Sequence, residues 1–143
     1  MSREPDAIVV GDELPPLRRI VTRDDVRAYA EIGGDRNPLH LDDEVARASG
    51  FDGVIAHGMF TMAHMASCVT AWAGPGAVVE RISAQFRASV SMGDELVASG
   101  RVRAVDDPAG TVTVEAWVDV VRVGASTLDR DRPIKQGEVV LRL

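Results

Sequence analysis

Three side chains that can bind water or move a proton lie within six residues of one another, at Asp35, Asn37 and His40. Pro38 separates the amide from the imidazole and prevents this segment from being a plain helix, because its ring removes a backbone donor and fixes φ. Imidazole changes charge near neutral pH, so it suits general acid–base catalysis. The segment therefore predicts proton transfer to and from a water molecule, with Asp35 and His40 as the acid/base pair.

A second segment, Ala56-His57-Gly58-Met59, opens a long apolar stretch. Backbone N–H groups at a helix start have no intrahelical acceptor and face the positive end of the helix dipole. Gly58 has no side chain, so a carbonyl oxygen can approach its N–H closely. The pattern predicts that the N–H of Gly58 stabilises negative charge that develops on a carbonyl.

Helix signals surround both segments. Thr22 can cap a helix that Gly33-Gly34 ends, and Asp42 or Asp43 can cap a short helix that runs to Ala48 and is closed by Gly50. Residues 57–73 are apolar on nearly every face, which predicts a helix buried on all sides. Gly74-Pro75-Gly76 ends that helix.

The second half of the chain alternates apolar and polar residues, as half-buried strands do. Strands are expected at residues 82–90, 96–105, 111–123 and 138–143, and one short strand is expected within residues 1–16. An antiparallel sheet next to a single apolar helix must wrap that helix to hide its faces. We therefore expect one α+β domain over residues 1–143, of ordinary size for a single core.

Composition excludes several classes. The net charge of −6 argues against nucleic acid as a partner, and no apolar run approaches the roughly 18 residues needed to span a bilayer. The N-terminus has no apolar signal-peptide core, and the single cysteine, Cys68, allows no internal disulfide, so we expect a cytoplasmic protein. No metal is expected, since His57 and His64 have no carboxylate or cysteine at ligand spacing.

The two segments together resemble the signature of the MaoC-like (R)-specific enoyl-thioester hydratases and dehydratases. Gly34-Asp35-Arg36-Asn37-Pro38-Leu39-His40 and Ile55-Ala56-His57-Gly58-Met59 carry the resemblance, which runs from about Val10 to Leu143. It implies a hot-dog fold, in which a curved antiparallel sheet wraps a long central helix. In size and layout the chain is also similar to the catalytic beta subunit of the mycobacterial (3R)-hydroxyacyl-ACP dehydratases.

The resemblance implies reversible addition of water to a trans-2-enoyl thioester, which gives the (3R)-hydroxyacyl product without a cofactor. It assigns the acid/base roles to Asp35 and His40, the orientation of Asp35 to Asn37, and the oxyanion contact to Gly58. Pro38 and His57 are expected at the substrate-binding site. We expect Pro38 to fix the backbone between the pair, and His57 to orient its turn through a hydrogen bond rather than to act in catalysis. Three residues of the apolar stretch are further candidates for substrate binding, and they either line an acyl channel or pack the core: Met59, Met62 and Ala63.

The expected partners are an acyl thioester on CoA or acyl carrier protein and a second hot-dog subunit that covers the open sheet edges. A homodimer is favoured because this chain carries both catalytic residues, and a heterodimer is the alternative. Two other functions compete with this one. The chain could be a dehydratase specific for carrier-protein substrates, or a non-catalytic subunit that binds acyl chains. A thioesterase is disfavoured because residues 57–73 contain no Asp or Glu. Four arginines are candidates for contacting an acidic carrier: Arg81, Arg87, Arg101 and Arg103.

Overall fold

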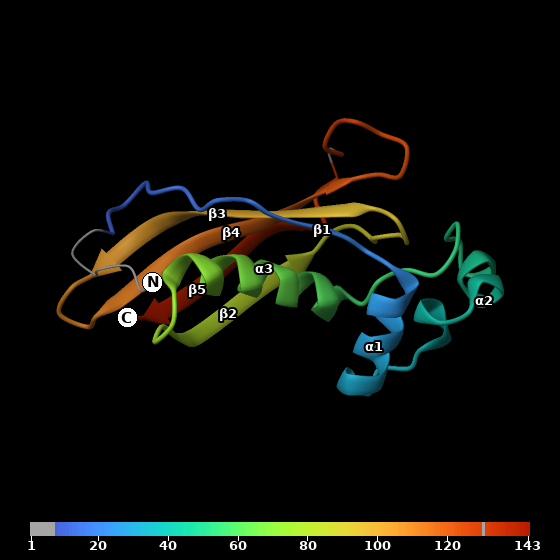
Figure 1. Ribbon diagram of the computed structural model, residues 1–143, viewed down its shortest axis with the longest axis horizontal. Helices are drawn as coiled ribbons and strands as arrows, with labels where there is room; N and C mark the ends of the chain where they lie inside the picture. The colour runs from blue at the N-terminus through green and yellow to red at the C-terminus, as the bar shows by residue number, and fades with distance from the viewer. Residues whose placement is uncertain (1–7, 130) are drawn as a thin grey trace.

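A computed structural model describes residues 8–129 and 131–143, which form one antiparallel sheet of five strands with a long helix against it (Figure 1). The strand order is β1-β3-β4-β5-β2, so β1 and β2 are the sheet edges. The elements, in chain order, are β1 (Leu17–Ile20), α1 (Arg23–Gly33), the 3₁₀ turn η2 (Pro38–His40), α2 (Asp43–Ala48), α3 (Gly58–Ala73), β2 (Val78–Phe86), β3 (Glu95–Asp106), β4 (Thr111–Val121) and β5 (Ile134–Arg142).

The core lies between α3 and the concave face of the sheet, with α1, η2 and α2 grouped at the N-terminal end of α3 (Figure 1). Alternate residues of β4 all point into this core, as the alternating pattern predicts: Val112, Val114, Ala116, Val118 and Val120. From the helix, Met65 and Val69 are fully buried against them. This is the expected hot-dog arrangement, a curved sheet around one central helix.

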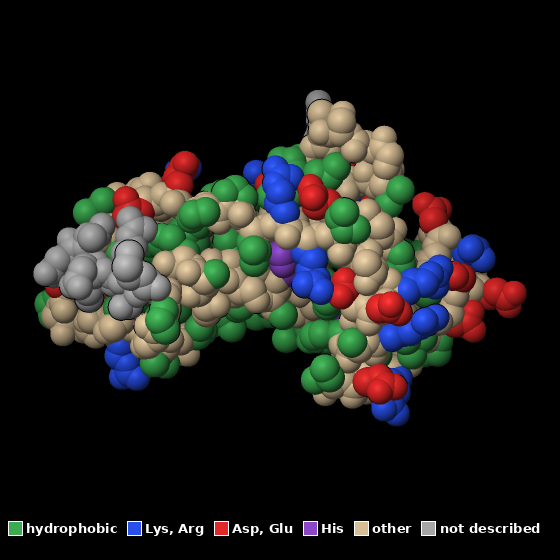
Figure 2. All heavy atoms as spheres, in the orientation of Figure 1, with side chains coloured by type: hydrophobic (Ala, Val, Ile, Leu, Met, Phe, Trp, Pro, Cys, Tyr) green, Lys and Arg blue, Asp and Glu red, His purple; other side chains and the backbone are tan. Residues whose placement is uncertain are grey.

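The prediction that the central helix is buried on all sides is wrong for a single chain. Met59, Ala63, Ser67 and Ala71 form an exposed row along α3, and Met59 is 53 % exposed. Figure 2 shows hydrophobic side chains at the surface around this helix. The sheet covers only one side of α3, because five strands do not close around the helix.

The first two helices begin and end where their capping residues predict. Thr22 and Asp25 form a reciprocal capping box at the start of α1, and Gly34 ends that helix in the left-handed conformation, with φ of 77°. Asp42 caps α2 by accepting from the N–H of Glu44. Local sequence is therefore sufficient to place the helices that flank the Asp35–His40 segment.

Several strands differ from their predicted positions. β1 lies at Leu17–Ile20, after Pro15-Pro16. Of the segment expected to hold a short strand, residues 1–7 lie outside the described residues, and residues 8–16 contribute one isolated bridge, between Glu13 and Arg101. β2 covers residues 78–86, not 82–90, and the following residues leave the sheet as a loop. β5 begins at Ile134, four residues before the predicted start, because Lys135 and Gln136 are exposed and hide the apolar alternation.

No helix among the described residues is both long enough and apolar enough to cross a membrane.

One buried histidine joins the central helix to the sheet edge. His64 of α3 is 7 % exposed, and its Nε2–H donates to the carbonyl of Leu17 in β1 at 2.9 Å. Burial lowers the pKa of His64, because the cation loses its hydration there. The folded state therefore holds His64 neutral.

We expect this neutral histidine to make stability depend on pH. As pH falls below about 6.5, the unfolded chain takes up the His64 proton before the folded chain does, so folded stability falls. The free energy of unfolding falls by at most about 1.4 kcal/mol per pH unit. This decrease continues until the pH passes the lower pKa that His64 has in the folded state. Urea unfolding at pH 7.5 and 5.5 should show a smaller loss for His64→Gln, which keeps an N–H donor, than for wild type. Equal losses would contradict this account.

Candidate active site

Two successive side-chain-to-backbone hydrogen bonds shape the loop between α1 and η2. Asp35 Oδ1 accepts from the N–H of Asn37 at 3.2 Å, and Asn37 Oδ1 accepts from the N–H of Leu39 at 3.1 Å. Such Asx turns bend the chain locally. Pro38 is the first residue of η2. A backbone N–H at this position would have no acceptor within the turn, so proline is tolerated there. The loop thus carries His40 back towards Asp35.

The structure assigns Asn37 a different hydrogen bond from the predicted one. Its backbone N–H, rather than its side chain, contacts the Asp35 carboxylate, while its side-chain oxygen caps η2. Asn37 therefore shapes the loop around Asp35 instead of holding the carboxylate with its amide group.

The two predicted proton carriers face each other. His40 Nδ1 lies 2.7 Å from the carbonyl of Ile55 and must donate to it, because a carbonyl only accepts. The other nitrogen, Nε2, lies 3.8 Å from Asp35 Oδ2. The His40 side chain is 11 % exposed and the Asp35 side chain is 56 % exposed. A mostly buried imidazole therefore lies beside a solvent-exposed carboxylate.

His57 links this loop to the central helix. Its ring stacks on that of His40, with the ring centroids 3.8 Å apart and the planes inclined by 25°. The ring of Tyr29 also contacts the His57 ring, with the two centroids 5.0 Å apart. Its Nε2–H donates to the carbonyl of Asp35 at 2.9 Å. The buried Nδ1 has no hydrogen-bond partner among the described residues. His57 therefore contacts both the loop, through the backbone carbonyl of Asp35, and the ring of His40.

Gly58 follows His57 directly and is the first residue of α3. Its N–H belongs to the first helical turn and has no acceptor within the helix. A Cβ at this position would lie 3.3 Å from the ring of Phe86, which is closer than nine in ten real Cβ contacts. The His40–His57 stack therefore brings a helix N-terminus without a side chain next to the proton carriers.

The three predicted lining residues on α3 do not share one environment. Met62 is half-buried and packs against the core, whereas Met59 and Ala63 are exposed. Within one chain, Met59 and Ala63 face away from the sheet and enclose no channel. Their predicted role in binding an acyl group therefore requires a second chain over the exposed row of α3.

The histidines and Asp35 are close enough together to raise the question of a metal. One ligand atom from each of Asp35, His40 and His57 lies within 4.8 Å of the others. However, a backbone carbonyl occupies one nitrogen of each histidine. The stacking also holds the lone pairs of the two rings in nearly parallel planes, with the ring centroids 3.8 Å apart. We derive no metal chemistry from this cluster.

Several contacts of the site have no signal in the sequence. The Ile55 carbonyl that holds His40 is a backbone group, which every residue possesses. Tyr29 and Phe86 read as ordinary core or strand residues, and only the folded chain brings them to His57 and Gly58. The motif predicts which residues carry protons but not the groups that hold those residues.

The family model for the MaoC like domain matches residues 9–123. The chain belongs to the MaoC-like domain family. It is 41 % identical over 96 residues to a mitochondrial 3-hydroxyacyl-[acyl-carrier-protein] dehydratase of Arabidopsis thaliana, a match that covers 67 % of this chain and 55 % of that protein. It is 40 % identical over 79 residues to a 3-hydroxybutyryl-CoA dehydratase of Methylorubrum extorquens, covering 54 % of this chain and 50 % of that protein. These matches therefore span about half the length of the relatives.

Solved structures support the same family. The (R)-hydratase from A. caviae involved in PHA biosynthesis superposes with a TM-score of 0.83 at 27 % identity, over 96 % of this chain and 98 % of that one. The MaoC-like hot-dog fold predicted from the motif is thereby confirmed over nearly the whole chain.

We predict that Asn37 stabilises the loop through its side-chain oxygen alone. Asn37→Ala removes the acceptor for the N–H of Leu39 and should lower the free energy of unfolding by about 1 kcal/mol. Asn37→Ser restores an oxygen at that place and should recover most of the loss. Urea unfolding of the two variants measures both effects. A serine variant as unstable as the alanine variant would show that the amide group itself is needed.

Proposed function

We propose that this protein catalyses the reversible addition of water to trans-2-enoyl thioesters, giving (3R)-hydroxyacyl thioesters. The observation that carries this proposal is the pairing of His40 Nε2 with Asp35 Oδ2 at 3.8 Å, with Gly58 at the start of α3 directly after His57, whose ring stacks on that of His40. A water at ordinary hydrogen-bond lengths of about 2.8 Å reaches both atoms. The names of relatives that act on hydroxyacyl thioesters support the substrate class, and the A. caviae (R)-hydratase supports the stereochemistry.

The hydration step uses these groups in order. Neutral His40 accepts a proton at Nε2 from the water while the water oxygen bonds to C3 of the enoyl group. Asp35 accepts a hydrogen bond from the same water and holds it. The C2=C3 electron pair moves towards the thioester oxygen, where the N–H of Gly58 and the α3 dipole stabilise the charge. The proton then passes from the pair to C2, which restores neutral His40.

The proposal is tested by following the enoyl absorbance of crotonyl-CoA and of a longer trans-2-enoyl-CoA on addition of the protein. Wild type should consume the enoyl band and form the (3R) product. Asp35→Asn and His40→Ala should each lower kcat by about 10²- to 10⁴-fold. Glu31→Gln, which neutralises an exposed carboxylate of α1, is the matched control and should leave kcat unchanged.

Activity that survives both substitutions would overturn the assignment of the pair. Failure of wild type to act on either CoA substrate, together with activity on the carrier-protein thioesters, would select the carrier-specific dehydratase. Inactivity towards both kinds of thioester would favour the non-catalytic acyl-binding subunit. Arg81 and Arg103, two of the arginines considered for carrier binding, both pair with Glu138, which reduces the positive charge that they offer to an acidic carrier.

The partner of this chain in our proposal is a second copy of itself. β2 is a sheet edge with exposed apolar residues, among them Val79 at 38 % and Phe86 at 49 %, and α3 runs close to this strand (Figure 1). A free, apolar strand edge invites pairing with another strand. Two copies that join at β2 would bury both α3 rows and enclose Met59 and Ala63 next to the site.

We expect a mass of about twice 15.3 kDa in analytical ultracentrifugation, because this interface removes an exposed apolar face from water. Ala63→Glu places a charge on the α3 row and should produce monomers with reduced activity. Ala28→Glu, at an exposed position of α1, is the control and should remain dimeric. A dimeric Ala63→Glu protein would contradict this interface. A monomeric and inactive wild type would instead indicate the heterodimer with a related subunit.

A further inference from the structure

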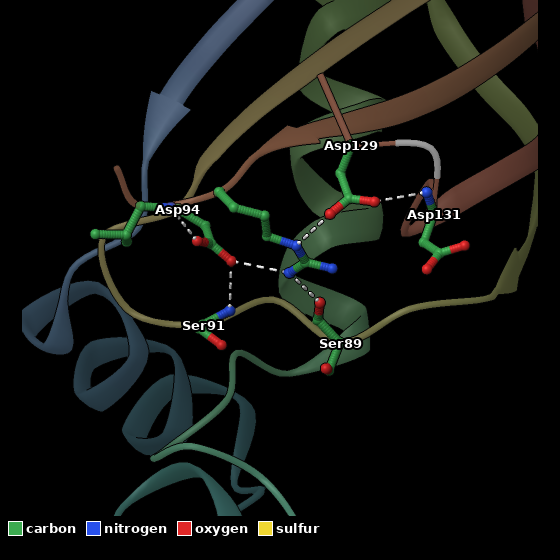
Figure 3. Close-up of polar contacts among 7 residues, drawn as sticks. Ser89, Ser91, Asp94, Asp129 and Asp131 are labelled. Atoms are coloured by element: carbon green, nitrogen blue, oxygen red, sulfur yellow. Dashed lines mark hydrogen bonds and ion pairs between the residues drawn. The ribbon is translucent and has the colours of Figure 1, made fainter. Parts of the chain in front are cut away.

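A buried carboxylate organises the loop that precedes β3. Asp94 is 2 % exposed and accepts three hydrogen bonds, from the N–H of Ser91 at 3.0 Å, the N–H of Val123 at 2.9 Å and Arg122 Nη1 at 2.9 Å (Figure 3). Both carboxylate oxygens are therefore used, and they join the β2–β3 loop to the end of β4.

Arg122 completes the connection. Besides Asp94, its guanidinium donates to the carbonyl of Ser89 at 2.8 Å and to Asp129 Oδ2 at 3.2 Å (Figure 3). Burial alone would lower the pKa of Arg122, but the two carboxylates outweigh this effect and the pKa is raised. The arginine stays charged, so residues 89–91 remain held from both ends.

The segment held in this way reaches the active site through the backbone. The N–H of Ala56 donates to the carbonyl of Val90 at 2.8 Å, and Ile55 forms an isolated β-bridge with Ser91. The Ile55 carbonyl is the acceptor for His40 Nδ1–H. Arg122 thus lies three steps from the catalytic imidazole, through residues 89–91 and 55–56.

The other anchor of Ile55 cannot fix this carbonyl independently. The N–H of Ile55 donates to the carbonyl of Leu39 at 3.1 Å, but Leu39 neighbours His40 and moves with the same loop. Residues 89–91 therefore link Ile55 and Ala56 directly to the β2–β3 loop, in addition to the anchor that the preceding Val54 has through its N–H to Asp43 Oδ1 at 3.0 Å. A shift of this segment would move the carbonyl and release His40 from the tautomer that leaves Nε2 bare.

We propose that the Asp94–Arg122 pair is a positioning element for His40, which sets the ring orientation and tautomer of the imidazole through the Ile55 carbonyl. This inference rests on the proposed hydratase function for its kinetic consequences. Neither Asp94 nor Arg122 contacts the substrate in this scheme, and their effect reaches the chemistry only through His40.

The chain supplies a matched control in a second arginine bound to a buried carboxylate. Arg132 Nε lies 2.6 Å from Asp119 Oδ1, Asp119 is 6 % exposed, and the guanidinium stands over the ring of Trp117. None of the contacts described for this pair involves residues 55–56 or 89–91. Loss of this pair should therefore disturb the fold locally without affecting His40.

The test compares Arg122→Gln with Arg132→Gln, both confirmed as folded by circular dichroism. Arg122→Gln should lower kcat by about tenfold or more with KM nearly unchanged, since small displacements of a reacting group are costly. Arg132→Gln should leave kcat near the wild-type value. Nitrogen-15 spectra of the imidazoles should show one neutral tautomer for His40 in wild type and Arg132→Gln, and a mixture in Arg122→Gln. Arg122→Lys, which keeps the charge beside Asp94, provides a milder variant should the glutamine variant not fold.

A double-mutant comparison identifies the route. If Arg122 acts through His40, then Arg122→Gln should cost nothing further in a His40→Ala background. A full tenfold loss in that background, or an unchanged His40 tautomer in Arg122→Gln, would overturn the positioning role. The spectra do not depend on turnover, so an inactive wild type with the predicted tautomer change would reject the hydratase alone.

Discussion

The site depends on one hydrogen bond, from His40 Nδ1 to the carbonyl of Ile55 at 2.7 Å. It determines which nitrogen carries the proton, and so leaves Nε2 free to face Asp35. The stack on His57 fixes the ring plane, and the bond from His57 to the Asp35 carbonyl holds the loop against the start of α3. The residues that we propose as acid, base and oxyanion donor are therefore positioned by contacts between two short segments of the chain.

The fold provides those segments with a rigid support. Residues 55–56 lie against the β2–β3 loop, which the buried Asp94 fastens to the end of β4, while α3 is packed into the sheet through Met65 and Val69. The opposite face of α3 remains open and apolar. In our proposal the same helix therefore presents its N-terminus to the reaction and its uncovered side to a second subunit.

Structural features that local sequence controls could be predicted from the sequence. Features that depend on tertiary contacts could not. Capping residues such as Thr22 and Asp42 placed the helices, and the motif predicted that Asp35 and His40 converge, as they do. β5 was predicted to start too late, because polar residues at its beginning interrupt the alternation. The exposed side of α3 was missed because an apolar composition does not distinguish burial by the sheet from burial by a partner.

The central claim is that Asp35 and His40 act on the same water as a unit. The most direct test measures kcat for Asp35→Asn, His40→Ala and the double variant with one enoyl-CoA substrate. Residues that act as a unit lose their combined contribution when either one is removed. The account predicts that the double variant is within a few-fold of the slower single variant. Losses that multiply in the double variant would show that the two residues act independently and would contradict the account.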